Sequence, residues 1–307
     1  MAILRKFWIV LLLTGLFHFL HGQEPRQSYR VFPGEKYMLD FEIQQNTHSE
    51  SVMEDEITLY SRGRMEFNID SLKEPDLICM TVQYRDLVLS MIAPGMNMDV
   101  NSGSGTNRLL TSMMDSLEQF SFRAVTDSRG ALEMQEGLEA RFESLADISV
   151  SDTAEQDVIL HTLREVYGPD AFSSLVSLFI SVYPVIQPMR NWTNDITYYF
   201  NTKPVKIVNR YQLAKTTDEQ MIIQGLGMIS VGKSYREHTD LGEVESTVSG
   251  SQTYDFQMDR SSGWLKQCVS RQRVLIETTI LDSPYLPKGL KIPSYTETDF
   301  EIRGSRL

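Results

Sequence analysis

Histidine and cysteine are the side chains here most able to bind a metal or act as a nucleophile. Beyond residue 22 the histidines are His48, His161 and His238, and the two cysteines are Cys79 and Cys268. No histidine pair has a metal-ligand spacing such as His-x3-His, and no histidine lies near either cysteine in the sequence. The sequence therefore predicts no metal site, no cofactor site and no catalytic cysteine.

Three other motifs fall short of a known chemistry. Asp99 begins a segment like a calcium loop, but its glycine comes one place early and Leu110 stands where a bidentate glutamate is needed. Gly225-Leu226-Gly227 lacks the third glycine and the following helix of a dinucleotide loop. The many acidic pairs are typical of a solvated surface. We therefore expect no enzyme, and a hydrolase without a recognised motif is the last of three hypotheses.

Methionine is frequent, with 15 residues in all, and apolar residues recur at helical spacing over 109–117. Methionine side chains adapt to varied apolar ligands, so this helix could line a pocket against a sheet face that carries large aromatic residues. Ordinary core packing is the alternative. The candidate ligand-binding residues are Met113, Met114, Leu117, Phe256 and Trp264.

Residues 1–22 have the three parts of a secretory signal peptide. A basic pair precedes an apolar run over 7–20, and Gly22 supplies a small residue before Gln23, the expected first residue of the mature chain. As a helix, the run would span only ~21 Å of the ~30 Å hydrocarbon core, which disfavours the alternative of an uncleaved anchor. The sequence thus predicts a periplasmic or secreted protein without a lipid-anchoring cysteine and without stable membrane insertion after cleavage.

The charge of the chain limits its partners. The sequence has 41 acidic and 29 basic residues, a net charge of −12. Nucleic acids and anionic lipid surfaces both attract cationic proteins, so neither is an expected partner. The expected partners are an apolar small molecule or another protein of the cell envelope.

Alternating apolar residues such as Tyr37, Leu39 and Phe41 indicate strands on both sides of a helical middle. The stretch 77–91 is either two strands or one strand bent near Arg85. We expect a signal peptide at 1–22, a linker at 23–35 and one β-rich domain at 36–307. Within the domain the expectation is strands at 36–100, helices at 104–183 with a hairpin at 120–134, strands at 194–280 and an irregular tail at 281–307.

Two segments that run from aspartate to glycine predict tight turns, Asp127–Gly130 and Asp259–Gly263. Aspartate bonds its own backbone and glycine accepts positive φ, so Gly130 and Gly263 are expected at positive φ. The likeness of the two turns indicates either a duplication or this general turn chemistry. A disulfide between the two cysteines and two free buried thiols both remain open.

The order of these features resembles a family of exported bacterial proteins of unknown function from Bacteroidetes-type bacteria. The resemblance covers most of residues 36–280 and includes the break at Pro94-Gly95 and the run that ends at Gly263-Trp264-Leu265. It implies no particular activity. More distantly, strands around a helical lid are similar to the open half-barrels of periplasmic lipoprotein carriers.

These observations predict an α+β fold: a large, curved, half-barrel-like antiparallel sheet with a mid-chain helical insertion packed on one face. The first hypothesis for function is a non-catalytic exported binding protein for an apolar, lipid-like ligand. The alternative is a structural or protein-interaction component of the cell envelope, which would use exposed strand edges.

Overall fold

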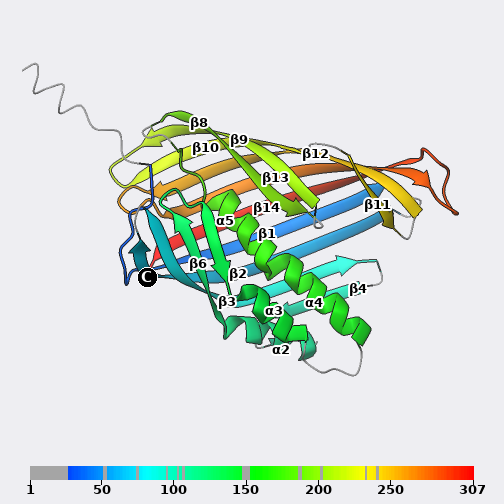
Figure 1. The fold of residues 1–307 in the computed structure, drawn as a ribbon, viewed down its shortest axis with the longest axis horizontal. Helices are drawn as coiled ribbons and strands as arrows, with labels where there is room; N and C mark the ends of the chain where they lie inside the picture. Colours follow the sequence, from blue (N-terminus) through cyan, green and yellow to red (C-terminus); the bar gives the residue numbers. More distant parts are fainter. Residues whose placement is uncertain are drawn as a thin grey trace, which may run out of the picture.

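A single antiparallel sheet dominates the computed structural model, and the helices come from the middle of the chain (Figure 1). The fold is largely β with a helical insertion, so the helical part of the expected α+β fold is the smaller one. The predicted signal peptide and Gln23 lie outside the residues that the structure describes. Those residues are 27–50, 54–73, 76–94, 96–101, 104–105, 108–146, 153–185, 189–200, 203–231, 234–239 and 242–307.

The sheet is open, and its strands follow the order β5-β4-β3-β2-β1-β14-β13-β12-β10-β9-β8. β11 pairs with β12, and the hairpin β6–β7 joins the sheet through β3. The strands are β1 (Lys36–Glu50), β2 (Glu54–Lys73), β3 (Leu77–Ala93), β4 (Met96–Asn101), β5 (Ser104–Gly105), β6 (Ser121–Asp127), β7 (Leu132–Glu136), β8 (Asn191–Phe200), β9 (Lys203–Thr216), β10 (Gln220–Ser230), β11 (Tyr235–Thr239), β12 (Gly242–Asp259), β13 (Leu265–Asp282) and β14 (Lys291–Arg306).

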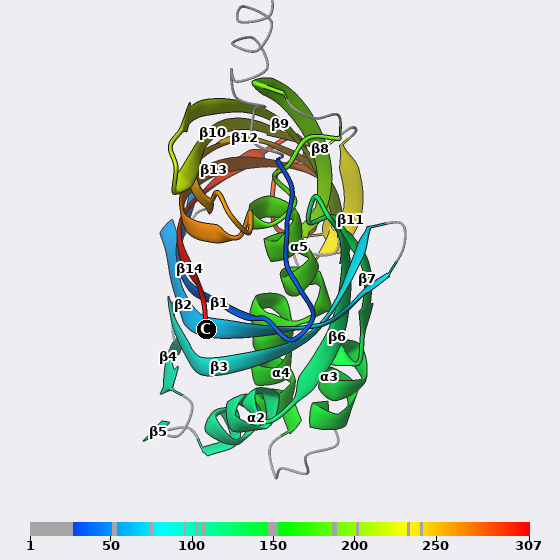
Figure 2. The same ribbon diagram turned by 90° about the vertical axis from the view of Figure 1, so that its left-hand side faces the viewer.

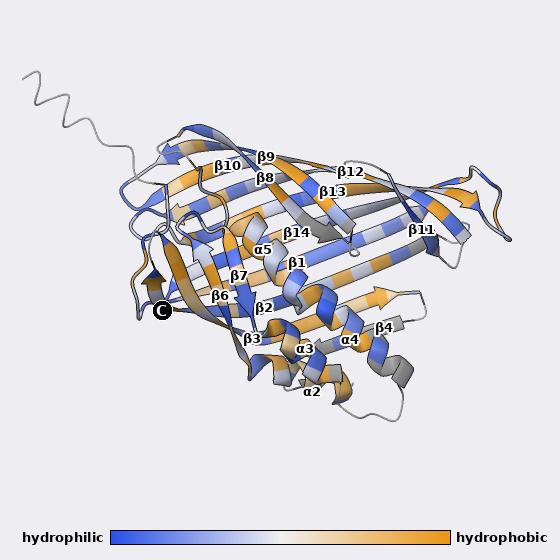
Figure 3. Ribbon diagram, in the orientation of Figure 1, coloured by the Kyte–Doolittle hydropathy of each residue, from blue (hydrophilic) through white to orange (hydrophobic). Residues whose placement is uncertain are grey.

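The sheet curls around α4 and α5, which lie against its concave face (Figure 2). Apolar and polar residues alternate along the long strands (Figure 3), and in strands such as β12 one face is buried. On the concave face, the ring of Phe179 in α5 lies 6.5 Å from that of Tyr254 and 5.1 Å from that of Phe300. The helices are α2 (Arg108–Glu118), α3 (Leu138–Ala146), α4 (Thr153–Tyr167) and α5 (Pro169–Phe179).

The C-terminal segment differs from the sequence expectation. Residues 281–307 were expected to be irregular because of their prolines, but β14 lies in the sheet between β1 and β13. Thr296, Thr298 and Ile302 are buried on its inner face. Pro293 is near the start of the strand, where a missing N–H removes only one ladder bond. The irregular part is therefore the short connection 283–290.

Both predicted turns have the expected backbone, with φ of +89° at Gly130 and +72° at Gly263. A short segment, residues 27–31, crosses both turns, and we call it the N-terminal strap. The N–H of Tyr29 donates to the carbonyl of Ser128 at 2.8 Å, and the N–H of Arg30 donates to that of Ser262 at 2.6 Å. The strap thus joins two hairpins that are far apart in the sequence.

The strap is part of the core rather than the linker expected over 23–35. Tyr29 and Val31 are buried, and the ring of Tyr29 lies 5.7 Å edge-on from that of Trp264. The expectation rested on polar residues and prolines in the segment. It failed because two apolar side chains at alternate positions suffice to bury a short extended segment once other elements provide a surface for them.

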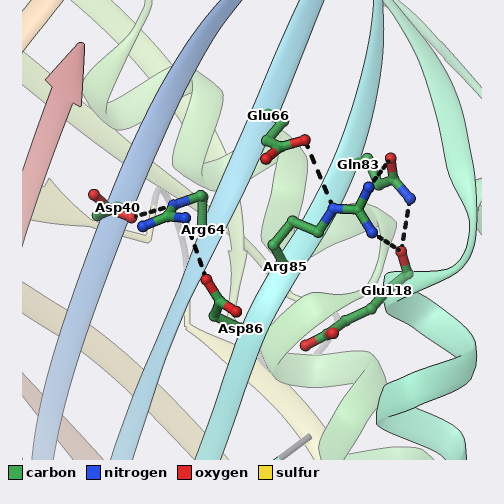
Figure 4. Close-up of polar contacts among 7 residues, drawn as sticks. All are labelled: Asp40, Arg64, Glu66, Gln83, Arg85, Asp86 and Glu118. Carbon is green, nitrogen blue, oxygen red and sulfur yellow. Dashed lines mark hydrogen bonds and ion pairs between the residues drawn. The ribbon is translucent and has the colours of Figure 1, made fainter. Parts of the chain in front are cut away.

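β3 is one long strand with a bulge, which decides between the two sequence readings of 77–91. Asp86 has a positive φ of 52°, and the pairing of β3 with β2 shifts register beside it. Arg64 on β2 makes ion pairs with Asp40 at 2.8 Å and Asp86 at 3.3 Å (Figure 4). The bulge leaves backbone groups of β3 without a partner on β2.

Glu118, the last residue of α2, satisfies the backbone at this bulge. Its carboxylate accepts the N–H of Leu87 at 2.7 Å. Its main-chain carbonyl accepts the side-chain amide of Gln83 at 2.7 Å and a longer bond from Arg85 at 3.4 Å (Figure 4). An acidic residue at a helix C-terminus opposes the helix dipole, so these bonds explain why a glutamate is tolerated there.

Glu118→Ala is expected to lower the free energy of unfolding by about 1–3 kcal/mol, because the N–H of Leu87 loses its partner in a poorly hydrated place. Glu143→Ala, at an exposed position of α3, is the control and should change stability by less than about 0.5 kcal/mol. Urea denaturation of both variants measures the difference. Equal stabilities would show that Glu118 does not hold α2 on the bulge.

Candidate functional site

The three candidate ligand-binding residues on α2 belong to the packed core. Met113, Met114 and Leu117 are all buried. α2 packs against β3, β4 and α3. Figures 1 and 2 both place it beside β3, away from β12. The partner that the sequence suggested for this helix, the face of β12, is therefore not the one that it covers.

The other two candidates, Phe256 and Trp264, pack among aromatic residues of their own. Phe256 stacks on Tyr254 with ring centroids 5.5 Å apart. Trp264, which precedes β13, stacks on Tyr37 at 4.4 Å. The structure therefore does not bring the five candidates together in one pocket.

The space beside Trp264 is too small for a lipid. A cavity of about 10 Å³ lies there between Tyr29, Phe67 and Phe172. Such a volume holds at most about one water molecule. At this place the core is filled, and a role of the five residues in ligand binding stays a prediction.

The described residues also contain no cluster of three or more metal-ligating side chains. Cys79 and Cys268 are free and buried. Burial, with a smaller effect of Asp255, raises the pKa of the Cys268 thiol well above its ordinary value, so the thiol stays protonated and unreactive. In the described part of the chain no helix is both long and apolar enough to span a membrane.

A larger open groove lies where the connection from α5 enters β8. Its volume of about 760 Å³ is within the range of small-molecule sites. We call it the Trp192 groove. It is lined by Pro184, Val185, Met189, Asn191, Trp192, Thr193, Arg210, Tyr211, Gln212, Gln224, Gly225 and Leu226.

One wall of the groove is formed by the paired strands β8, β9 and β10. Thr193, Arg210 and Leu226 are neighbours across the three strands. Asn191, Gln212 and Gln224 form the next row of the same face, and all six side chains are exposed. Neutral polar groups, one guanidinium and one aliphatic side chain thus share a solvent-facing surface.

The described parts of the connection between α5 and β8 supply Pro184, Val185 and Met189 to the groove, and hydrogen bonds hold these parts. The indole N–H of Trp192 donates to the carbonyl of Val182 at 2.9 Å. In the strap, the side-chain amide of Gln27 donates to the carbonyl of Met189 at 2.7 Å, and its oxygen accepts the N–H of Met189 at 3.1 Å. Hydrogen bonds therefore hold Val182 and Met189, and the bonds at Met189 come from the N-terminal strap.

The glycines of the Gly225-Leu226-Gly227 motif make room for side chains of β9. A Cβ on Gly225 would lie 2.6 Å from the ring of Tyr211, and one on Gly227 would lie 2.5 Å from Oδ1 of Asn209. Their absence lets Tyr211 and Asn209 lie across β10. Burial raises the pKa of the Tyr211 hydroxyl far above its ordinary value, so this buried side chain stays neutral.

Sequence reasoning missed the groove, although β10 carries a signal for it. Ile223 and Ile229 face the core, yet Leu226 and Met228 at the opposite phase are 47% and 57% exposed. A strand that is apolar on both faces indicates that its outer face also meets something apolar. Arg210 gave no signal, because a lone arginine in a strand is common on protein surfaces.

Solved structures show limited similarity to this chain. A structure concerning lipid–protein interactions in lipovitellin has 10% sequence identity and a TM-score of 0.51, over 90% of this chain and 25% of that one. The chain thus spans about a quarter of the length of that protein, and the likeness concerns the fold alone.

Two further structures are similar only at TM-scores too low to support an argument. One is a protein from Bacteroides fragilis described as exported, with a YmcC-like fold (10% identity, TM-score 0.17, 88% of this chain and 97% of that one). The other is an outer membrane channel from Pseudomonas putida F1 (8% identity, TM-score 0.25, 92% and 100%).

No curated protein sequence matches the chain significantly. One family model does match, over residues 76–265, which is more than half of the chain and extends from β3 to the start of β13. It includes β8, β9 and β10 and all the residues that line the groove, whereas the strap and β14 lie outside it. On this match, the chain belongs to the family of unknown function DUF6263.

Proposed function

We propose that this protein is an exported, non-catalytic binding protein that holds an apolar ligand in the Trp192 groove. The groove itself carries the proposal. Its volume suits a small molecule, and its lining includes the exposed side chains of Val185 and Leu226. Covering aliphatic side chains in a concave site with an apolar ligand removes their surface from water, which is favourable.

Two further observations support the class of ligand and the compartment. The fold is similar to part of lipovitellin, a protein whose structure concerns lipid–protein interactions. Residues 1–22 have the pattern of a signal peptide, which is consistent with export. A lipid-like molecule outside the cytoplasm is therefore the ligand class that we propose.

Titration of the purified protein with Nile red, a neutral apolar dye, tests the proposal. We expect saturable binding with an increase in dye fluorescence. Leu226→Glu should weaken it by about tenfold or more, because a carboxylate in the groove would lose hydration when the dye binds. Val269→Glu is the matched control, since Val269 on β13 is 49% exposed and lies outside the groove lining.

Saturable binding that is lost only in Leu226→Glu would support the groove as the site. An absence of saturable binding would overturn the proposal and favour the alternative role in contacts between envelope proteins. Equal effects of both variants would place the dye elsewhere and would also overturn the proposal.

A further inference from the structure

We infer that Arg210 makes the Trp192 groove selective for a long-chain carboxylate, such as a fatty acid, over neutral lipids. This inference rests on the proposed function, because it names the chemical class of the ligand that the groove would hold. It is carried by the position of Arg210 and by how the acidic residues around it are engaged.

Arg210 lies where a carboxylate and an alkyl chain could be bound together. It is exposed on β9, and its cross-strand neighbours are Thr193 on β8 and Leu226 on β10. A guanidinium thus stands directly beside an exposed aliphatic side chain within one groove. An amphiphile can place its head on Arg210 and its chain along Leu226 toward Val185.

Two acidic residues on strands close to Arg210 are bound to other groups. Asp195, two residues beyond Thr193 on β8, makes an ion pair with Lys206 at 2.6 Å. Asp255 on β12 accepts the side-chain amide of Gln224 at 2.9 Å. Within the described part of the chain, no carboxylate lies within ion-pair distance of Arg210.

Several exposed arginines elsewhere on the sheet, in contrast, have a carboxylate partner. On β13, Arg271 pairs with Asp299 at 2.7 Å and Arg273 pairs with Glu297 at 3.0 Å. An arginine left without such a partner in a groove keeps all its donors available for a ligand.

Guanidinium geometry favours a carboxylate head. The planar fork of an arginine can donate two parallel hydrogen bonds to the two oxygens of one carboxylate. Thr193 and Gln212 next to Arg210 can donate further hydrogen bonds without adding charge. A neutral amide head would lose the ionic part of this interaction while keeping the same alkyl chain.

Competition against Nile red with oleate and oleamide, which share one chain and differ in head charge, tests the inference on the purified protein. We expect oleate to bind about tenfold more tightly than oleamide. Arg210→Gln should abolish this preference, and Arg210→Lys should retain part of it. Arg271→Gln removes an exposed arginine outside the groove and should leave the preference intact.

The outcomes separate this inference from the proposed function. Binding of both compounds with equal affinity, or a preference for oleate that survives in Arg210→Gln, would overturn the role of Arg210 and leave the apolar site standing. Failure of both compounds to compete, together with no saturable binding of the dye, would overturn the proposed function itself. Thermal denaturation of each variant verifies that the exposed substitutions leave the fold intact.

Discussion

Gly263→Val is expected to lower the free energy of unfolding by about 3 kcal/mol or more, and Gly130→Val by a similar amount. Both positions have positive φ, which a β-branched residue adopts only with strain. In addition, a Cβ on Gly263 would lie 2.3 Å from the carbonyl oxygen of Ser28, and one on Gly130 would lie 2.4 Å from that of Ile180. Backbone atoms must move in either variant.

Gly289→Val separates the backbone strain from the steric clash. Gly289 has a φ of +84°, but nothing lies within 4 Å of the place that its Cβ would occupy. We expect a loss of only about 1 kcal/mol there. Urea denaturation of the three variants gives the comparison. Equal losses of stability at all three glycines would mean that steric contact with the strap and with the end of α5 does not contribute at the two turns.

Tyr29→Ala is expected to lower the free energy of unfolding by about 3–5 kcal/mol, as is typical for the removal of a buried aromatic ring. The ring of Tyr29 lies 5.2 Å from that of Tyr183 and 5.7 Å from that of Trp264. Its hydroxyl also donates to the carbonyl of Ile180 at 3.0 Å. The substitution would leave a cavity between the sheet and the end of α5.

Two further variants sharpen this test. Tyr29→Phe keeps the ring and loses only the hydrogen bond, so we expect a loss of about 1 kcal/mol. Tyr285→Ala, at a position that is 81% exposed, should change stability by less than about 0.5 kcal/mol. Thermal and urea denaturation measure all three. A loss in Tyr29→Ala no larger than that in Tyr285→Ala would show that the strap is not part of the core.

The local features of the fold were predictable from short stretches of sequence. Alternation such as Tyr254, Phe256 and Met258 predicts a strand with one buried face, because successive side chains of a strand point to opposite sides. The positive φ of Gly130 and Gly263 was predictable because few other residues adopt that backbone conformation. Each of these inferences needs only residues that are close together in the chain.

The misplaced elements depend on contacts between distant residues. β14 pairs with β1, so that Phe41 opposes Ile302 at the other end of the chain. The strap is buried only because Trp264 and Tyr183 provide a surface for Tyr29. Proline content and polarity describe a segment by itself, and they carry no information about the surface that it will meet.

The candidate site also has features that the sequence predicts and features that depend on the tertiary structure. The sequence by itself determined which residues are apolar, which strands have a buried face, and that Met113, Met114 and Leu117 must be covered by something apolar. Only the tertiary structure decided that β3 and α3 cover them, and that Arg210 and Leu226 meet in a groove beside Trp192. The physical reason is that strand order and the path of the connection from α5 to β8 set which side chains become neighbours. That order follows from the packing of the whole sheet. A local hydrophobic pattern shows which face of one strand or helix is buried, but not which other element covers that face.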